Sequence, residues 1–208
     1  MKEIISKIGQ VKGSSISKII SQRMNEFKEL GEKSDGEIFK ELCFCLLTAN
    51  FNANGGIKIQ KEINNGFLHL SREELAQKLA IFGHRFPNAR AKFIFEARKY
   101  KDDIRNLLGS FSDEKTARNW LAENIKGLGM KESSHFLRNI GYKNIAIVDF
   151  HIMDLLAKHG LIEKPKTLTA KKYVEIENML ENLAKKLNMS LGELDLYLWY
   201  LETGKVLK

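Results

Sequence analysis

Hydrophobic residues recur at helical spacing along most of this chain, whereas the alternating pattern typical of strands is nearly absent. Three serines are each followed three residues later by a glutamate: Ser34 and Glu37, Ser71 and Glu74, and Ser190 and Glu193. In such a capping box the two side chains bind free backbone amides at a helix start, so helices are predicted to begin near residues 35, 72 and 191. The pattern therefore predicts an all-α fold.

Pro87 predicts a further helix start, because its fixed φ suits the first helical turn and its missing N–H is not needed there. The residues that follow it at helical spacing are Ala91, Ile94, Phe95 and Arg98. A helix beginning at Pro87 would place the preceding loop at its N-terminal end.

A chain of 208 residues is long enough for one domain or for two small lobes. We expect a two-lobed helical bundle with a cleft between the lobes. One lobe is predicted to comprise residues 35–125 and the other residues 1–34 together with 126–208. No Gly/Ser-rich linker marks the boundary. Residues 141–148 are expected to form either a short strand or an extended connector.

Lys and Arg number 34 and Asp and Glu 26, which gives a formal net charge of +8. A positive charge favours a polyanionic partner without identifying it. No apolar run approaches the roughly 20 residues of a membrane span, and the N-terminal residues lack the pattern of a secretory signal. We therefore expect an intracellular protein without a membrane partner. The two cysteines, Cys43 and Cys45, lie in an apolar stretch and are expected to be buried thiols.

Residues 125–129, Ile-Lys-Gly-Leu-Gly, match the apolar-x-Gly-apolar-Gly signature of a helix-hairpin-helix motif. Gly127 and Gly129 permit a tight turn with positive φ and let the backbone approach a phosphate. Lys131 then lies at the start of the following helix. The residues of that helix predicted to pack inward are Ser133, Phe136, Leu137 and Ile140. Lys131 and His135, four residues apart, are predicted to share the outward face.

Asp149 follows Lys131 by eighteen residues and is the candidate partner of its amine. An amine with a nearby carboxylate can displace a base from a sugar and hold the sugar as a Schiff base. The carboxylate could stabilise positive charge on the sugar or relay the proton that Lys131 must lose. The simpler interpretations are a phosphate-binding surface lysine and a helix N-cap, and a capping Asp149 could do both.

The sequence resembles the helix-hairpin-helix superfamily of base-excision glycosylases and, within it, the archaeal-type 8-oxoguanine DNA glycosylases of the second class. The resemblance covers nearly the whole chain and is most specific at residues 41–50, 83–86, 129–139 and 194–200. It implies removal of 8-oxoguanine from DNA and strand nicking by β-elimination, with Lys131 as the Schiff-base nucleophile and Asp149 as its carboxylate. One departure is Phe150, which stands where the family usually has a basic residue.

An excised base must leave the duplex, so a side chain must fill the gap. His84, Arg85 and Phe86 are the candidates, since they precede the Pro87 helix and residues 85–101 contain six Lys or Arg and one Glu. Packing of Phe86 onto its own helix as a hydrophobic staple is the alternative. The resemblance favours the wedge.

The base pocket is expected on the last helix, where Asp195 and Trp199 share a face. An apolar stripe on another face comprises Leu191, Leu194, Leu198 and Leu201. The alternative for the pair is a buried Trp with a surface Asp. The resemblance implies that the terminal carboxylate of Lys208 closes the pocket. His135 and His151 are interpreted as phosphate or pocket contacts.

The expected partner is double-stranded DNA that contains 8-oxoguanine, bound by a monomer associated with the nucleoid. No metal and no cofactor are expected: iron-sulfur relatives place four cysteines after the catalytic segment, whereas none follows Cys45 here. The five histidines show no ligand spacing. Two other functions remain open, a glycosylase for oxidised pyrimidines and a non-catalytic hairpin module that binds DNA.

Overall fold

The computed structural model describes all residues from Met1 to Lys208, which form thirteen α-helices and no strand. The helices are α1 (Lys2–Lys12), α2 (Ile16–Gly31), α3 (Asp35–Thr48), α4 (Ala53–Ile63), α5 (Gly66–His69), α6 (Arg72–Ile81), α7 (Pro87–Ala97), α8 (Ile104–Gly109), α9 (Glu114–Asn124), α10 (Met130–Asn139), α11 (Phe150–Lys158), α12 (Ala170–Leu187) and α13 (Leu191–Thr203), with a short 3-10 helix at Arg98–Tyr100. The predicted all-α fold is confirmed. None of the helices combines the length and apolar character needed to cross a membrane.

The predicted helix starts are those observed: α3 begins at Asp35, α6 at Arg72, α7 at Pro87 and α13 at Leu191. Ser71 forms a complete capping box, since its Oγ accepts from the N–H of Glu74 and its own N–H donates to the Glu74 carboxylate. Ser190 caps α13 through the N–H of Glu193. Ser34 is the N-cap of α3 but makes no side-chain capping bond. Each capping bond stabilises its helix by about 1 kcal/mol.

The chain divides into a central unit, Leu30–Ile140, and a terminal unit formed by Met1–Glu29 and Gly141–Lys208. This division differs from the expected one in the hairpin, which belongs to the central unit and not to the unit that carries Asp149. The reason is the packing of α10 against α9 and α3. At the end of α10, Asn139 Nδ2 donates to Glu41 Oε1 of α3 at 2.6 Å, with both side chains buried.

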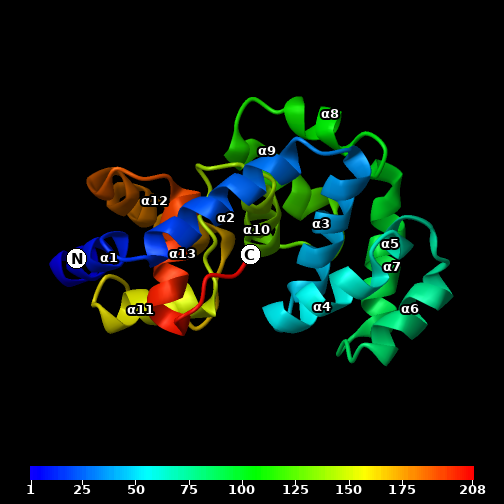
Figure 1. The fold of residues 1–208 in the computed structure, drawn as a ribbon, viewed down its shortest axis with the longest axis horizontal. Helices are drawn as coiled ribbons and strands as arrows, with labels where there is room; N and C mark the ends of the chain where they lie inside the picture. The colour runs from blue at the N-terminus through cyan, green and yellow to red at the C-terminus, as the bar shows by residue number, and fades with distance from the viewer. The chain divides into compact units, whose positions relative to one another are not determined.

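In the central unit, α3 packs against α4, α5, α7, α8 and α10 (Figure 1). Every residue from Ile38 to Thr48 is buried, so this helix is enclosed on all sides. Cys43 and Cys45 are fully buried thiols that form no disulfide, as expected, and burial raises the pKa of Cys43 well above its usual value. An enclosed helix gives the surrounding helices one common surface to pack on.

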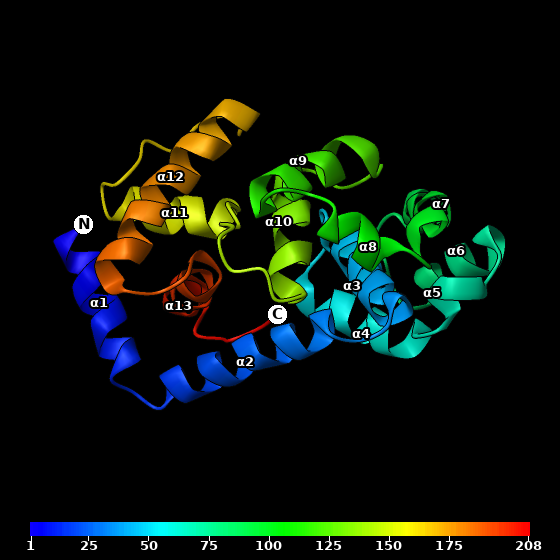
Figure 2. The ribbon, with the colours of Figure 1, turned by 90° about the horizontal axis from the view of Figure 1, so that it is seen from above.

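In the terminal unit, α13 is the helix on which the others pack, as α3 is in the central unit. It packs against α1, α11 and α12 (Figure 2). Its apolar stripe is confirmed for Leu191, Leu194 and Leu198, each 4% exposed or less, while Leu201 is half-buried.

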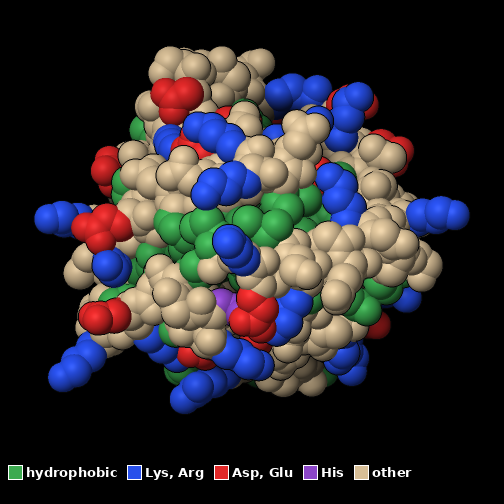
Figure 3. All heavy atoms as spheres, turned by 90° about the vertical axis from the view of Figure 1, so that its left-hand side faces the viewer, with side chains coloured by type: hydrophobic (Ala, Val, Ile, Leu, Met, Phe, Trp, Pro, Cys, Tyr) green, Lys and Arg blue, Asp and Glu red, His purple; other side chains and the backbone are tan.

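The surface shown in Figure 3 has Lys and Arg side chains with Asp and Glu among them and hydrophobic side chains between. The net positive charge is therefore not spread as a uniform layer over the surface.

Candidate active site

The hairpin joins α9 to α10 through a turn in which Gly127 has φ +96°. A Cβ on Gly127 would lie 2.4 Å from the ring of Phe93 on α7. This position therefore requires glycine for two reasons, its positive φ and the lack of space for a side chain. Gly129 differs from the expectation, because its φ is −105° and only Gly127 has a positive φ in the turn. Gly129 is the N-cap of α10, whose first intrahelical bond runs from the N–H of Ser133 to the Gly129 carbonyl.

The predicted inward face of α10 is confirmed, since Ser133, Phe136 and Leu137 are fully buried and Ile140 is 6% exposed. His135, predicted to face outward, is instead 7% exposed and lies edge-on to the ring of Phe44, with 5.6 Å between ring centroids. Four residues along a helix advance the direction of a side chain by about 40°. That rotation carries His135 from the direction of Lys131 towards the core.

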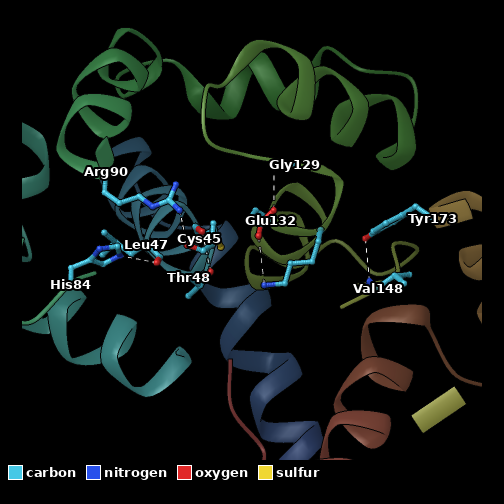
Figure 4. A network of polar contacts seen from close by, with 11 residues as sticks. Cys45, Leu47, Thr48, His84, Arg90, Gly129, Glu132, Val148 and Tyr173 are labelled. Carbon is cyan, nitrogen blue, oxygen red and sulfur yellow. Dashed lines mark hydrogen bonds and ion pairs between the residues drawn. The ribbon is translucent and has the colours of Figure 1, made fainter. Parts of the chain in front are cut away.

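Lys131 is the second residue of α10, and its side chain is 26% exposed. Its Nζ lies 3.9 Å from Oε1 of Glu132, while Oε2 of the same carboxylate accepts a 3.3 Å hydrogen bond from the N–H of Gly129 (Figure 4). Sequence reasoning missed Glu132. The signal was present, because a glutamate in the third position of a helix commonly bonds back to the N-cap amide.

Asp149 is the N-cap of α11, and its Oδ1 accepts a 2.9 Å hydrogen bond from the N–H of Ile152. The interpretation as a cap is confirmed. The preceding residues 141–148 contain no strand and form a connector. Lys131 belongs to the central unit and Asp149 to the terminal unit, so two parts of the fold supply the candidate catalytic groups.

Two buried residues of α12 hold this connector. The hydroxyl of Tyr173 donates to the carbonyl of Ala146 at 2.8 Å. It accepts from the N–H of Val148 at 3.2 Å (Figure 4). Oε1 of Glu177 accepts from the N–H of Ala146 at 3.2 Å. Neither Tyr173 nor Glu177 was a candidate from the sequence. Together they satisfy backbone groups directly before Asp149, which would be costly to bury without partners.

The loop before α7 exposes two of its three candidate wedge residues. His84 is only 4% exposed, its Nε2 lies 3.0 Å from the carbonyl of Leu47, and its Nδ1 accepts from the N–H of Phe86 (Figure 4). Burial lowers the pKa of His84, partly offset by the Leu47 hydrogen bond, and the nearby Arg90 lowers it further. His84 is thus buried support for the loop, and its assignment to the wedge is corrected.

Arg85 and Phe86 are both exposed, and the Arg85 guanidinium lies 5.0 Å from the centroid of the Phe86 ring. The ring is 40% exposed. An exposed aromatic ring with a cation above it has the chemistry expected of a wedge, and Phe86 and Arg85 remain the candidates.

On α13, Asp195 is 8% exposed and lines a narrow hollow in the terminal unit that has no room for a water molecule. The other lining residues are apolar: Ala146, Ile147, Ile152, Leu180, Leu191, Leu194 and Leu198. The alternative of a surface aspartate is therefore wrong. Trp199 meets the ring of His151 edge-on at 4.8 Å, and its indole N–H is buried without a hydrogen-bond partner.

His151 itself is exposed, as is the neighbouring Phe150, at 71%. Lys208 is half-buried at the end of a segment that leaves α13 at Gly204, where φ is +69°. Lys208, Trp199 and His151 all belong to the terminal unit.

In this all-helical protein the glycine turn joins two helices that pack on each other, α9 and α10, which is a helix-hairpin-helix arrangement. Residues 20–189 match the family model described as 8-oxoguanine DNA glycosylase. The chain belongs to this family, and the resemblance inferred from its motifs is confirmed.

Two similar proteins are named 8-oxoguanine DNA glycosylase/AP lyase. The one from Korarchaeum cryptofilum is 54% identical and covers 99% of this chain and 98% of its own length. The one from Methanocaldococcus jannaschii is 55% identical and covers 99% of both chains. Relatives of this name therefore share the whole length of the chain.

Two crystal structures have the same fold. The Methanocaldococcus jannaschii 8-oxoguanine glycosylase/lyase in complex with a 15mer DNA containing 8-oxoguanine superimposes with a TM-score of 0.96 at 55% identity, over 99% of this chain and 100% of that one. The 8-oxoguanine DNA glycosylase of Thermotoga maritima gives a TM-score of 0.93 at 45% identity, over 100% and 99% of the two chains.

Proposed function

We propose that this bifunctional DNA glycosylase and AP lyase removes 8-oxoguanine from double-stranded DNA through a Schiff base on Lys131 and nicks the strand by β-elimination. The observation that carries the proposal is the placement of Lys131. It is a partly exposed amine in the first turn of the helix that follows the glycine hairpin. Family membership supports the reaction class.

In the first step the neutral amine of Lys131 attacks C1′ of the damaged nucleotide, and the base leaves with the electron pair of its bond to C1′. The C1′–O4′ bond then opens as the nitrogen lone pair forms the C1′=Nζ bond of the iminium, and O4′ takes up a proton. Positive charge develops on the sugar as the base departs. The carboxylate of Asp149, held as a helix cap, stabilises that charge and can relay the proton lost by the amine. A fixed anion is effective here because it needs no reorganisation when the charge appears.

Recognition is assigned to both units. Phe86 and Arg85 fill the gap left by the flipped nucleotide. Asp195 and Trp199, with the terminal carboxylate of Lys208, form the base pocket, and His151 supports the indole ring. The half-exposed Trp199 is available for stacking on a purine.

Borohydride trapping tests the nucleophile, because only a Schiff base is reduced to a stable protein–DNA adduct. The protein should form an adduct with 8-oxoguanine duplex, and Lys131→Gln should form none. Lys126→Gln is the matched control, since Lys126 is an exposed lysine of the same hairpin and loses the same charge. An adduct with Lys131→Gln would contradict the assignment.

The substrate is tested with duplexes that carry either 8-oxoguanine or an oxidised pyrimidine. We expect faster base release from 8-oxoguanine. Faster release of the oxidised pyrimidine would leave the Lys131 chemistry intact and overturn the assigned lesion.

A further inference from the structure

The carboxylate of Glu132 lies beside the candidate nucleophile and is hydrogen-bonded to the hairpin backbone. One oxygen, Oε2, accepts the Gly129 N–H at 3.3 Å, and the other, Oε1, lies 3.9 Å from Nζ of Lys131 (Figure 4). The side chain is 17% exposed. A carboxylate tethered by one oxygen presents its second oxygen in a restricted region around the amine.

A buried arginine interacts electrostatically with this carboxylate. Arg90 is 6% exposed, and its Nη2 donates to the carbonyl of Ala49 at 2.6 Å. Burial lowers the pKa of Arg90, and the charge of Glu132 partly offsets this. An ionised carboxylate is the form that accepts a proton.

The position of this oxygen fits the second half of the reaction. Once Nζ is bonded to C1′ of the sugar, C2′ is only two bonds from Nζ. Elimination begins with loss of a proton from C2′. We propose that Glu132 is the catalytic base of strand nicking and takes this proton on Oε1. The inference rests on the proposed Schiff base at Lys131.

The C2′–H bond breaks, its electron pair forms a C1′=C2′ double bond, and the positive iminium becomes a neutral enamine. The enamine pair then re-forms the iminium as a C2′=C3′ double bond appears and the C3′–O bond breaks. The 3′ phosphate leaves with the electron pair of that bond. The proton stays on the Glu132 carboxyl until water removes it. Asp149 thus serves base release and Glu132 serves nicking.

A duplex with a preformed abasic site tests this step alone, because no base has to be removed. Two quantities are measured for each variant, the borohydride adduct and the rate of nicking, with protein-free duplex as background. Glu132→Gln keeps an oxygen that can accept the Gly129 N–H but cannot serve as the base. We expect it to retain the adduct and to nick about 100-fold more slowly, the typical contribution of a general base.

Glu123→Gln is the matched control, since Glu123 is an exposed glutamate of α9 in the same motif and loses the same charge. It should nick at the wild-type rate. Glu132→Asp keeps a base on a shorter side chain and should nick faster than Glu132→Gln. Thermal unfolding followed by circular dichroism reports whether each variant is folded. If Glu132→Gln does not fold, Glu132→Asp carries the test, with retained adduct and slowed nicking as the expected result.

Nicking by Glu132→Gln within about threefold of the wild-type rate would overturn the inference. Loss of the adduct together with nicking in a folded variant would also overturn it, because Glu132 would then act before elimination. Failure of the proposed function looks different, since wild-type protein would itself form no adduct on this duplex.

Discussion

The central and terminal units present their candidate catalytic groups in opposite ways. Lys131 of the central unit ends a long side chain whose amine has an ion-pair contact at 3.9 Å and retains partial exposure. Asp149 of the terminal unit is a short side chain held by the N–H of Ile152 at 2.9 Å, on a connector bonded to Tyr173 and Glu177. The proposed nucleophile is thus the longer and less constrained side chain, while the proposed anion is held in place as a helix cap.

The strongest test of this contrast is Asp149→Asn. Asparagine caps helices about as well as aspartate, so the thermal unfolding temperature should change little. Base release from 8-oxoguanine duplex should fall by about 100-fold or more, because the charge is lost while the geometry is kept. Single-turnover excision measures the rate, and duplex binding should be retained. Equal excision by the variant would remove Asp149 from the chemistry.

The connector is tested by Tyr173→Phe, which removes one hydroxyl from a buried position. The N–H of Val148 and the carbonyl of Ala146 would each lose a partner. We expect the free energy of unfolding to fall by about 1–3 kcal/mol. Excision should slow by about tenfold, because Asp149 would be less firmly placed. Unchanged excision in a destabilised variant would show that the connector supports the fold without positioning Asp149.

The hairpin allows a comparison within the central unit between its two glycines. Gly127→Ala introduces a Cβ 2.4 Å from the Phe93 ring at a residue with φ +96°, and should cost about 1–3 kcal/mol of stability. Gly129→Ala meets only Oε2 of the Glu132 side chain, at 3.2 Å, and should cost below about 1 kcal/mol. Urea unfolding of both variants measures the difference. Equal costs would contradict the observed turn.

The smallest expected effect is a pH dependence from His84. Because the folded pKa of His84 lies below its unfolded value of about 6.5, the unfolded chain binds the proton more readily. This contribution to stability is present above that value and is lost as the pH falls through the folded pKa. Between pH 7.5 and 5.5 the free energy of unfolding of the wild-type protein should therefore fall more than that of the His84→Gln variant. Urea unfolding at several pH values measures both. Parallel curves would contradict the prediction.

Local signals in the sequence located the helices well. The serine–glutamate pairs and Pro87 gave the starts of four helices, because capping depends on residues within one turn of each other. The hairpin, the nucleophile candidate and the capping Asp149 follow from similarly short patterns. Glu132 also belongs to a short pattern and was overlooked.

The misplaced residues depend on contacts between distant segments. His84 and His135 are buried by Leu47 and Phe44 of α3, and helical spacing alone does not say how much of a helix its neighbours cover. The supports of the connector, Tyr173 and Glu177, lie 25 and 31 residues from the backbone groups they bind. The hairpin was assigned to the other lobe for the same reason, since its packing on α3 has no local signature.

The length of helix α7 fixes the distance between two features that are candidates for contact with DNA. Phe86 lies at its N-cap, and Phe93, seven residues later, packs against Gly127 of the hairpin. Seven residues of helix span about 10 Å, so this helix sets the spacing between the candidate wedge and the glycine turn of the hairpin. That length corresponds to about three nucleotide steps along one strand. A bound duplex would therefore have to match this fixed spacing before the bond to the base is broken.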